Sequence, residues 1–430
     1  MTARTGGLFV SGAAVFALAS ITASARQDVA PPVEAKAPLI IKVGVDLIQI
    51  DASVTDKQGR PVKDLRAEDF TIEIDGKKQP VSNATFFDGG PGSSATGANT
   101  SPDSVSPPRT IVFMVDDLNW SFDSMNRARR AMKTFADGWD FSEARVGFRS
   151  VSDKGETVLL SKSPEKFQTA IRGIRYNIRS DRGASSGPGF LGPAPNFEAL
   201  AAGVRTSSVS SVSEGNPGLS RANYDQRLYN LLSTINGLRS VPGRKALVLV
   251  SEGFAFGRDR SKLGISSPFD DLFAEGEGVD SVLHMVTEVA NRASVVIYTL
   301  DPSGLLAGIS GSYVGKDPSA AVYRSAWSAR TSNHWSLARL SEDTGGLSVY
   351  NNNNLRGGLN QIVNDQRAYY VLGFEPPKAA FEKSSGKPKF HEIKLKVNRP
   401  DVRVRTRAGF YGVTDEDVIQ KAPLMSVTEH

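Results

Sequence analysis

The sequence contains no cysteine and only four histidines in 430 residues. Without cysteine, the chain has no disulfide bond, no thiolate nucleophile and no zinc site with thiolate ligands. The histidines, which are His284, His334, His391 and His430, follow no spacing typical of a metal site. We interpret His334 as an exposed residue of a helix. These absences exclude several common classes of metal enzyme and cysteine enzyme.

Other catalytic and binding signals are also scarce. No glycine-rich turn follows the first apolar strand of the central region, and no phosphate-binding loop occurs. Residues 183–187, GASSG, match the G-x-S-x-G pattern of hydrolases, but they lie in a serine- and glycine-rich loop rather than between a strand and a helix. The net charge of +5 is too dilute over the chain to indicate nucleic-acid binding. We therefore expect no enzymatic activity and no nucleic-acid partner.

Residues 1–25 are typical of a signal peptide. Arg4 precedes an apolar run over residues 8–23, and Ala23-Ser24-Ala25 matches an A-x-A cleavage site. Residues 26–39 are expected to follow as a flexible leader. Beyond them no segment approaches the roughly 18 consecutive apolar residues that a membrane helix requires. We expect a bacterial protein that is periplasmic or secreted, with no integral membrane segment after cleavage.

Two β-rich segments flank the central part of the chain. Residues 40–88 are predicted to form an N-terminal β module, in which Asp75-Gly76 signals a tight hairpin, and residues 367–413 form a C-terminal β segment. Residues 89–108 are a linker rich in glycine, serine and proline, and residues 414–430 are a polar tail. Neither flank has enough strands to be stable alone, so we expect the two to form one β-sandwich. A separate C-terminal sheet is the alternative.

Residues 109–366 alternate strands and helices, which predicts an α/β domain with a doubly wound, mostly parallel sheet. The strands at 111–115, 246–250 and 294–300 are continuous apolar runs, as expected where helices cover both faces of a sheet. Two short strands at 145–151 and 157–160 are expected to form a hairpin at the sheet edge. Helices are predicted to begin near Ser121 or Asp123 and to cover residues 166–174, 224–238, 280–291, 335–343 and 355–365.

Two of the apolar strands end at a carboxylate, Asp116 in one and Glu252 in the other. In open α/β sheets the ligand crevice lies outside the carboxyl ends of the strands. Both acids are therefore expected at one edge, where a hard cation or a cationic partner group can bind. Three insertions, at residues 179–223, 254–279 and 302–333, are expected to shape the surface around this edge.

Several segments along the chain carry a resemblance to a known family. They are VDDLN at 115–119, LVSEG at 249–253, IYTLD at 297–301, LA at 337–338 with EDTGG at 342–346, and RAYYVLGF at 367–374. On these segments the α/β part resembles a von Willebrand factor type A (VWA) domain. The chain resembles the acidobacterial VWFA-related family over about residues 45–412. The resemblance implies an exported bacterial protein built on a fold that mediates adhesion and assembly.

Type A domains often hold Mg²⁺ or Mn²⁺ at a metal-ion-dependent adhesion site, and the resemblance implies a degenerate form of that site here. Asp116 matches the first position of the family's Asp-x-Ser-x-Ser pattern, whereas Leu118 and Trp120 replace the two serines. Glu252 stands where the family has an aspartate, and no counterpart of the family's threonine is apparent. The strict motif is therefore mostly lost.

A rebuilt metal site would draw on oxygens from outside the strict motif. Mg²⁺ prefers about six oxygen ligands, and the candidates are Asp116, Asn119, Ser121 and Glu252, with Asp117 or Asp301 nearby. The alternative is that Asp116 caps the following helix or pairs with an arginine. We interpret Asp117 as an acid at the start of that helix.

We expect a non-enzymatic binding or adhesion protein that recognises a protein partner at the carboxyl edge of the sheet. A metal-independent structural component of the cell envelope is the alternative. Arg403, Arg405 and Arg407 alternate along a strand and so project from one face. We interpret them as a solvated edge that opposes aggregation, with binding of an anionic glycan as the alternative.

Overall fold

The computed structural model describes residues 48–89, 96–97, 108–118, 120–153, 157–177, 217–253, 279–305, 318–377, 380, 389–411 and 426–429. The predicted signal peptide, the leader and most of the three insertions lie outside the described residues, as does Asn119. No helix in the described part of the chain is long and apolar enough to cross a membrane.

The centre of the fold is a five-stranded parallel sheet with the order β11-β10-β9-β6-β7. Its strands are β6 (Arg109–Val115), β7 (Arg145–Ser150), β9 (Arg244–Val250), β10 (Val295–Leu300) and β11 (Ser348–Val349). Every residue of β6, β9 and β10 is buried. This burial on both faces is the reason that these strands are continuous apolar runs in the sequence.

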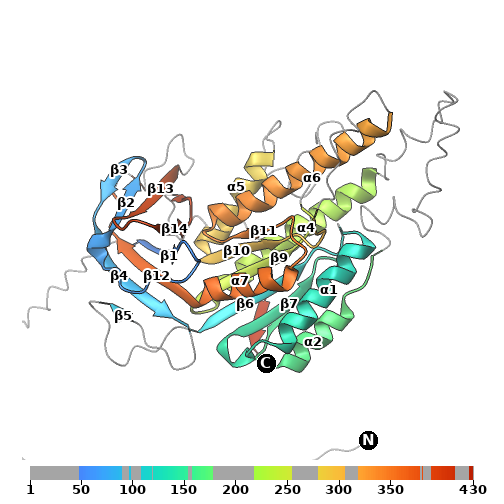
Figure 1. Cartoon of the computed structure of the whole chain (residues 1–430), viewed down its shortest axis with the longest axis horizontal. Helices are drawn as coiled ribbons and strands as arrows, with labels where there is room; N and C mark the ends of the chain where they lie inside the picture. Colours follow the sequence, from blue (N-terminus) through green and yellow to red (C-terminus); the bar gives the residue numbers. More distant parts are fainter. Residues whose placement is uncertain are drawn as a thin grey trace, which may run out of the picture. The chain divides into compact units, whose positions relative to one another are not determined.

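Helices cover both faces of this sheet, as Figure 1 shows. On one face α1 (Phe122–Asp137), α2 (Pro164–Gly173) and α7 (Leu355–Arg367) pack into one apolar core. On the other face α4 (Pro217–Gly237), α5 (Val279–Arg292) and α6 (Pro318–Asp343) pack into a second core. Short 3₁₀ turns lie at Ala67–Asp69, Phe141–Glu143 and Leu238–Ser240. The domain is therefore doubly wound around a parallel sheet, as the sequence predicts.

Several elements differ from the sequence-based expectation. Helix α4 begins at Pro217 rather than near residue 224, and β5 (Thr96–Gly97) lies in the predicted linker. Helix α6 begins at Pro318, well before the predicted start at residue 335, because alanine and arginine favour helix even without a sustained apolar face. The predicted edge hairpin is only partly formed. Strand β7 is parallel to β6, and β8 (Thr157–Leu160) is joined to it by the single antiparallel bridge Val146–Ser161. β8 instead pairs in parallel with β16 (Ser426–Glu429), which lies in the predicted polar tail.

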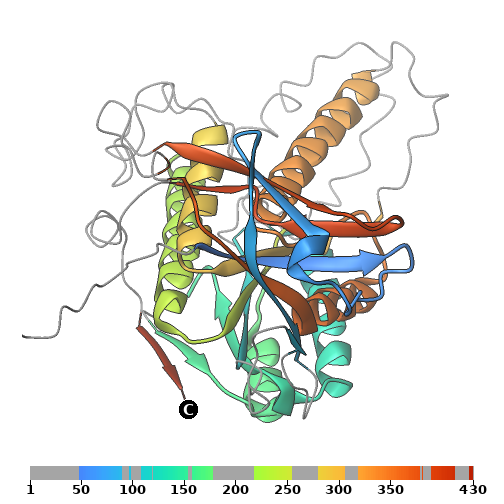
Figure 2. The same cartoon turned by 90° about the vertical axis from the view of Figure 1, so that its left-hand side faces the viewer.

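Strands from the two ends of the described chain share two antiparallel sheets, the arrangement that the sequence predicts. One sheet has the order β14-β1-β12-β4-β5 and the other β15-β13-β2-β3. In Figure 2 the blue N-terminal strands lie beside the red C-terminal strands. The bounds are β1 (Ile48–Asp56), β2 (Phe70–Ile74), β3 (Lys77–Gln79), β4 (Val81–Asp88), β5 (Thr96–Gly97), β12 (Ala368–Phe374), β13 (Phe390–Val397), β14 (Val402–Thr406) and β15 (Gly409–Tyr411).

The sandwich has its own apolar core and one well-defined hairpin. Phe70 on β2 and Tyr370 on β12 meet edge to face across the two sheets, with ring centroids 5.2 Å apart. Between β2 and β3, Asp75 and Gly76 have φ angles of 49° and 78°, the left-handed pair that a type I′ turn needs. The Asp-Gly pair therefore makes the hairpin that the sequence predicts.

A buried polar network joins the sandwich to the α/β domain. Asp365 on α7 accepts hydrogen bonds from Ser53 Oγ on β1 and from the Tyr298 hydroxyl on β10, both at 2.7 Å. Arg405 on β14 forms an ion pair with the same carboxylate. Arg407 donates to the carbonyl oxygens of Gln49 on β1, at 3.1 Å, and of Asn291 on α5, at 3.3 Å.

The interpretation of the three arginines as a solvated edge is therefore wrong for two of them. Arg405 and Arg407 face polar groups of neighbouring elements, and only Arg403 is exposed. Alternation along a strand determines on which face of the sheet a side chain lies. It does not show which residues pack against that face, because those residues come from distant parts of the chain.

Candidate functional site

The point where the sheet reverses its winding lies between β6 and β9. The chain leaves β6 through α1 to β7 on one side, and it leaves β9 through α5 to β10 on the other. Ligands of open α/β sheets bind outside the carboxyl ends of the strands at this reversal. Asp116 follows β6 and Glu252 follows β9, and the Asp116 N–H donates to the Val250 carbonyl at 2.9 Å. The two predicted acids therefore lie at one edge.

Asp116 is fully buried and has partners within the domain. Its Oδ2 accepts a hydrogen bond from the Ser251 hydroxyl at 2.7 Å. The same oxygen lies 3.9 Å from the Arg227 guanidinium of α4, a side chain that is also buried. Burying a carboxylate is tolerable when a cation and a hydrogen-bond donor accompany it. The arginine pair was the predicted alternative to a metal at this carboxylate.

Ser121 and Glu252 meet at the start of α1. The Ser121 N–H donates to Glu252 Oε1 at 2.8 Å, and Ser121 Oγ accepts from the Ser124 N–H at 3.2 Å. Ser121 is therefore the N-cap of α1, as predicted, and Glu252 places a carboxylate at the positive end of the helix dipole. Both residues serve the local structure.

The described donor set does not fit a resident divalent cation on Asp116. Leu118 and Trp120, at the positions of the family's serines, are buried in the apolar cores. The Arg227 guanidinium lies beside the carboxylate that would bind the ion. No cluster of three or more histidine and acidic residues suited to a metal occurs among the described residues. Because Asn119 is outside them, the full set of Asp116, Asn119, Ser121 and Glu252 stays a prediction.

Asp117 does not lie at a helix start, so that interpretation is wrong. Helix α1 begins at Phe122, and Asp117 is buried at the end of β6. Its carboxylate accepts hydrogen bonds from the N–H of Ser152, at 2.8 Å, and from the Ser152 hydroxyl. Burial raises the pKa of Asp117 above its ordinary value, against the effect of these hydrogen bonds. The residue joins the carboxyl ends of β6 and β7.

A second polar cluster follows β10. Asp301 accepts from the Ser303 hydroxyl at 2.6 Å and lies 2.7 Å from His334 Nε2, with Arg330 at 3.6 Å. Burial works against ionisation, but the hydrogen bonds from His334 and Ser303 lower the pKa of Asp301 below its ordinary value. The interpretation of His334 as an exposed helix residue is therefore wrong, because its side chain is only 12% exposed.

Helix α6 lies against the carboxyl end of β9. Gly253 has a φ of +114°, and a Cβ there would lie 2.2 Å from the Cβ of Asn333. Asn333 Nδ2 donates to the carbonyl oxygen of Glu252 at 3.3 Å. This close approach requires glycine, and it brings the His334 cluster to the same edge as Glu252.

Three large exposed apolar side chains lie in the segments that follow the strands at this edge, and we call Phe122, Leu305 and Tyr350 the apolar rim. Each follows the carboxyl end of a parallel strand, and their exposed fractions are 57%, 56% and 45%. Their segments are joined, since Arg127 Nε of α1 donates to the Pro302 carbonyl at 2.8 Å and the Leu305 N–H donates to Asn353 Oδ1 at 3.0 Å. The edge thus has a buried polar floor and an exposed apolar rim.

Sequence reasoning located the acids of this edge but missed Arg227. The signal lies in α4, where Asn223, Arg227, Asn230 and Thr234 recur at helical spacing and are all buried. These four polar residues lie next to the predicted apolar face of α4, and such a position indicates that they contact polar groups of the sheet.

Comparison with known proteins adds little to this description. No protein-family model matches the chain, and no curated protein matches it. Among solved structures the chain is similar to the human COPII-coat protein Sec24c, with 11% identity and a TM-score of 0.25. The match covers 72% of this chain but only 45% of that one. Because the likeness is so low, it carries no argument about the fold or the function of this chain.

Proposed function

We propose that this chain is a non-enzymatic VWA-type binding protein, periplasmic or secreted, that recognises a protein partner at the carboxyl edge of its parallel sheet. The observation that carries the proposal is the apolar rim at the reversal of the sheet. Exposed apolar side chains in neighbouring segments are a feature of protein-binding surfaces.

The exposure of the rim supports recognition of a protein. Phe122, Leu305 and Tyr350 each keep about half of their surface in water, which costs free energy that a partner would recover by covering them. Tyr350 also stacks near His334, with ring centroids 4.8 Å apart, so that its position is restricted before binding. Aromatic side chains held in this way are common energetic centres of interfaces.

The polar floor supports recognition without a resident metal. Asp116 has Ser251 and Arg227 as partners, and Asp301 has Ser303 and His334. Such carboxylates need no added cation for charge compensation. The partner would then contact the rim and its polar surroundings, and the buried acids would hold the three strand ends in place.

Capture of envelope proteins with matched variants tests this proposal. Phe122→Ser and Leu305→Ser remove rim side chains, whereas Leu159→Ser removes one of similar exposure, 51%, on β8. We expect a partner that the wild type and Leu159→Ser retain and that both rim variants lose. Equal capture by all four proteins would contradict the proposal. It would favour the alternative of a structural envelope component that makes contacts through its sandwich.

A further inference from the structure

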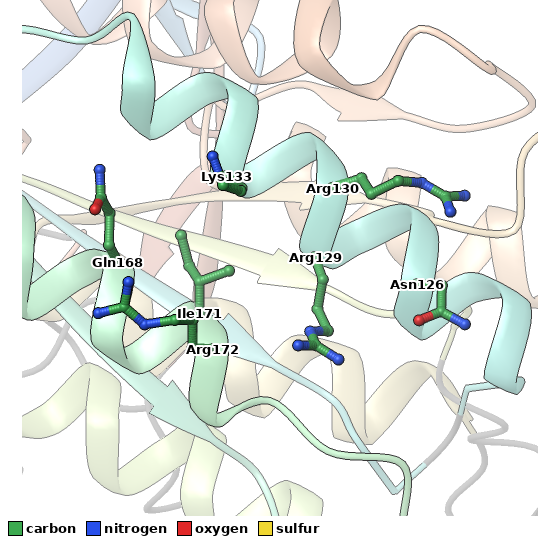
Figure 3. Close-up of a pocket in the computed structure, with 7 residues that line it drawn as sticks. All are labelled: Asn126, Arg129, Arg130, Lys133, Gln168, Ile171 and Arg172. Atoms are coloured by element: carbon green, nitrogen blue, oxygen red, sulfur yellow. The ribbon is translucent and has the colours of Figure 1, made fainter.

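A basic groove lies between α1 and α2 and shares no lining residue with the apolar rim. Its volume is about 330 Å³. Figure 3 shows the lining residues, which are Asn126, Arg129, Arg130 and Lys133 from α1 and Gln168, Ile171 and Arg172 from α2. Ile171 is buried and the others are half-buried or exposed, so a polar wall surrounds a small apolar patch.

The positive charge of the groove is only partly compensated. Lys133 forms an ion pair with Asp137 at 2.8 Å, and Gln168 Nε2 donates to the other oxygen of the same carboxylate at 3.3 Å. Arg172 donates to the neutral hydroxyl of Thr169 at 2.9 Å. No carboxylate of the described residues pairs with Arg129, Arg130 or Arg172. The side chains of Arg129, Arg130 and Arg172 therefore line the groove without a carboxylate partner among the described residues, and their guanidinium groups point in different directions in Figure 3.

This combination of groups suits one class of ligand. Guanidinium groups bind phosphate oxygens through two parallel hydrogen bonds, and they do so better than ammonium groups. The side-chain amides of Asn126 and Gln168 offer both donors and acceptors, as hydroxyl groups of a ligand require. The volume of the groove, about 330 Å³, is at the lower end of the range of about 300–1,000 Å³ for small-molecule sites.

We propose that the α1–α2 groove binds a phosphate group carried by a compact, hydroxyl-bearing body of about the size of a sugar. The phosphate lies against the Arg129 guanidinium, which points from α1 toward α2 in Figure 3, and the neutral body lies against the amides and Ile171. Either a soluble sugar phosphate or the head group of a phospholipid supplies this chemistry. None of the apolar-rim residues lines the groove, although Phe122 lies one turn before Asn126 on α1 and its ring contacts that of Tyr176, just after α2.

Calorimetric titration of the full chain with defined probes tests this proposal. The soluble probes are glucose 6-phosphate, inorganic phosphate and uncharged glucose. A parallel experiment measures sedimentation with vesicles of phosphatidylglycerol or of phosphatidylcholine. We expect saturable binding of glucose 6-phosphate, or of phosphatidylglycerol vesicles if the source is a membrane, and none of glucose or phosphatidylcholine. Binding should weaken with added salt, since the groove is open to solvent.

Variants of the guanidinium groups complete the test. Arg129→Gln/Arg172→Gln should weaken binding of the phosphate probe by about tenfold or more, because charge-assisted hydrogen bonds are lost. Arg172→Gln alone should weaken binding in the same direction but by less. Because Arg172 is exposed, this single variant should fold normally, so it keeps the test valid if the double variant misfolds. Arg403→Gln removes an exposed arginine from β14 and should leave the affinity unchanged. Absence of binding to every phosphate probe, or equal losses in Arg403→Gln and in the double variant, would overturn the proposal.

Discussion

Replacing Asp365 by alanine should weaken the whole described fold, because this carboxylate joins the sandwich to the α/β domain. It accepts hydrogen bonds from Ser53 of β1 and Tyr298 of β10, and it pairs with Arg405 of β14. Burial first, and then the neighbouring Asp365 charge, raise the pKa of Tyr298, so its hydroxyl stays protonated and donates at all ordinary pH values. Asp365→Ala removes the only carboxylate among these four groups.

The structure gives the size of the effect. Removing one partner of a buried ion pair costs about 3–5 kcal/mol, and a buried hydroxyl that loses its acceptor costs about 1–3 kcal/mol. The sum is reduced because the Arg405 side chain is 33% exposed, so water can partly replace its lost partner. We therefore expect a loss of about 3–4 kcal/mol in the free energy of unfolding. That is a large part of a typical domain's stability.

Urea unfolding followed by tryptophan fluorescence and by circular dichroism measures this loss. The matched control is Asp64→Ala, since Asp64 also pairs with an arginine, Arg399 at 2.6 Å, but is 72% exposed. Exposed pairs contribute little, so the control should unfold almost as the wild type does. A shift for Asp365→Ala no larger than that for Asp64→Ala would refute the view that this network joins the two parts.

Two further predictions concern the carboxyl edge. The pKa of buried Asp117 is raised above its unfolded value of 3.8, so the wild type loses stability as pH rises from that value through the folded pKa. Asp117→Asn removes this loss, because asparagine does not ionise. In urea titrations, the difference in free energy of unfolding between Asp117→Asn and the wild type should therefore shift in favour of the variant from about pH 3 to about pH 7. A shift in favour of the wild type would contradict this. Gly253→Ala forces a Cβ to 2.2 Å from that of Asn333 at a φ of +114°, so we expect a loss of about 1–3 kcal/mol by the same assay. Gly173→Ala, where a Cβ meets nothing within 4 Å, is the control, and an equal effect of both would argue against the clash.

The sequence predicted those parts of the fold that depend on residues close together in the chain. The uninterrupted apolar runs at β6 and β9 indicate strands that are buried on both faces, and the structure confirms this burial. Ser121 caps α1 because a short hydroxyl side chain can accept a helix N–H. The order of strands and helices also placed Asp116 and Glu252 at one edge.

Charged residues were predicted less well, because their burial depends on partners far away in the sequence. Arg227 reaches Asp116 over a separation of more than a hundred residues, and Arg405 reaches Asp365 from another sheet. His334 was interpreted as exposed because nothing nearby in the sequence shows that Asp301 would accept its hydrogen bond. The sequence analysis made no prediction for Arg227 and interpreted Arg405 and His334 as exposed, whereas the tertiary structure gives each of the three a carboxylate partner.

We propose that the carboxyl edge recognises its partner without a resident metal, since Arg227 and Ser251 already accompany Asp116. Calorimetric titration of the EDTA-treated protein with Mg²⁺, Mn²⁺ and Ca²⁺, beside Asp116→Ala, tests it most directly. We expect no saturable binding of any of these ions to the wild type. Saturable binding that Asp116→Ala abolishes would contradict it, and would establish a rebuilt metal site that includes Asp116.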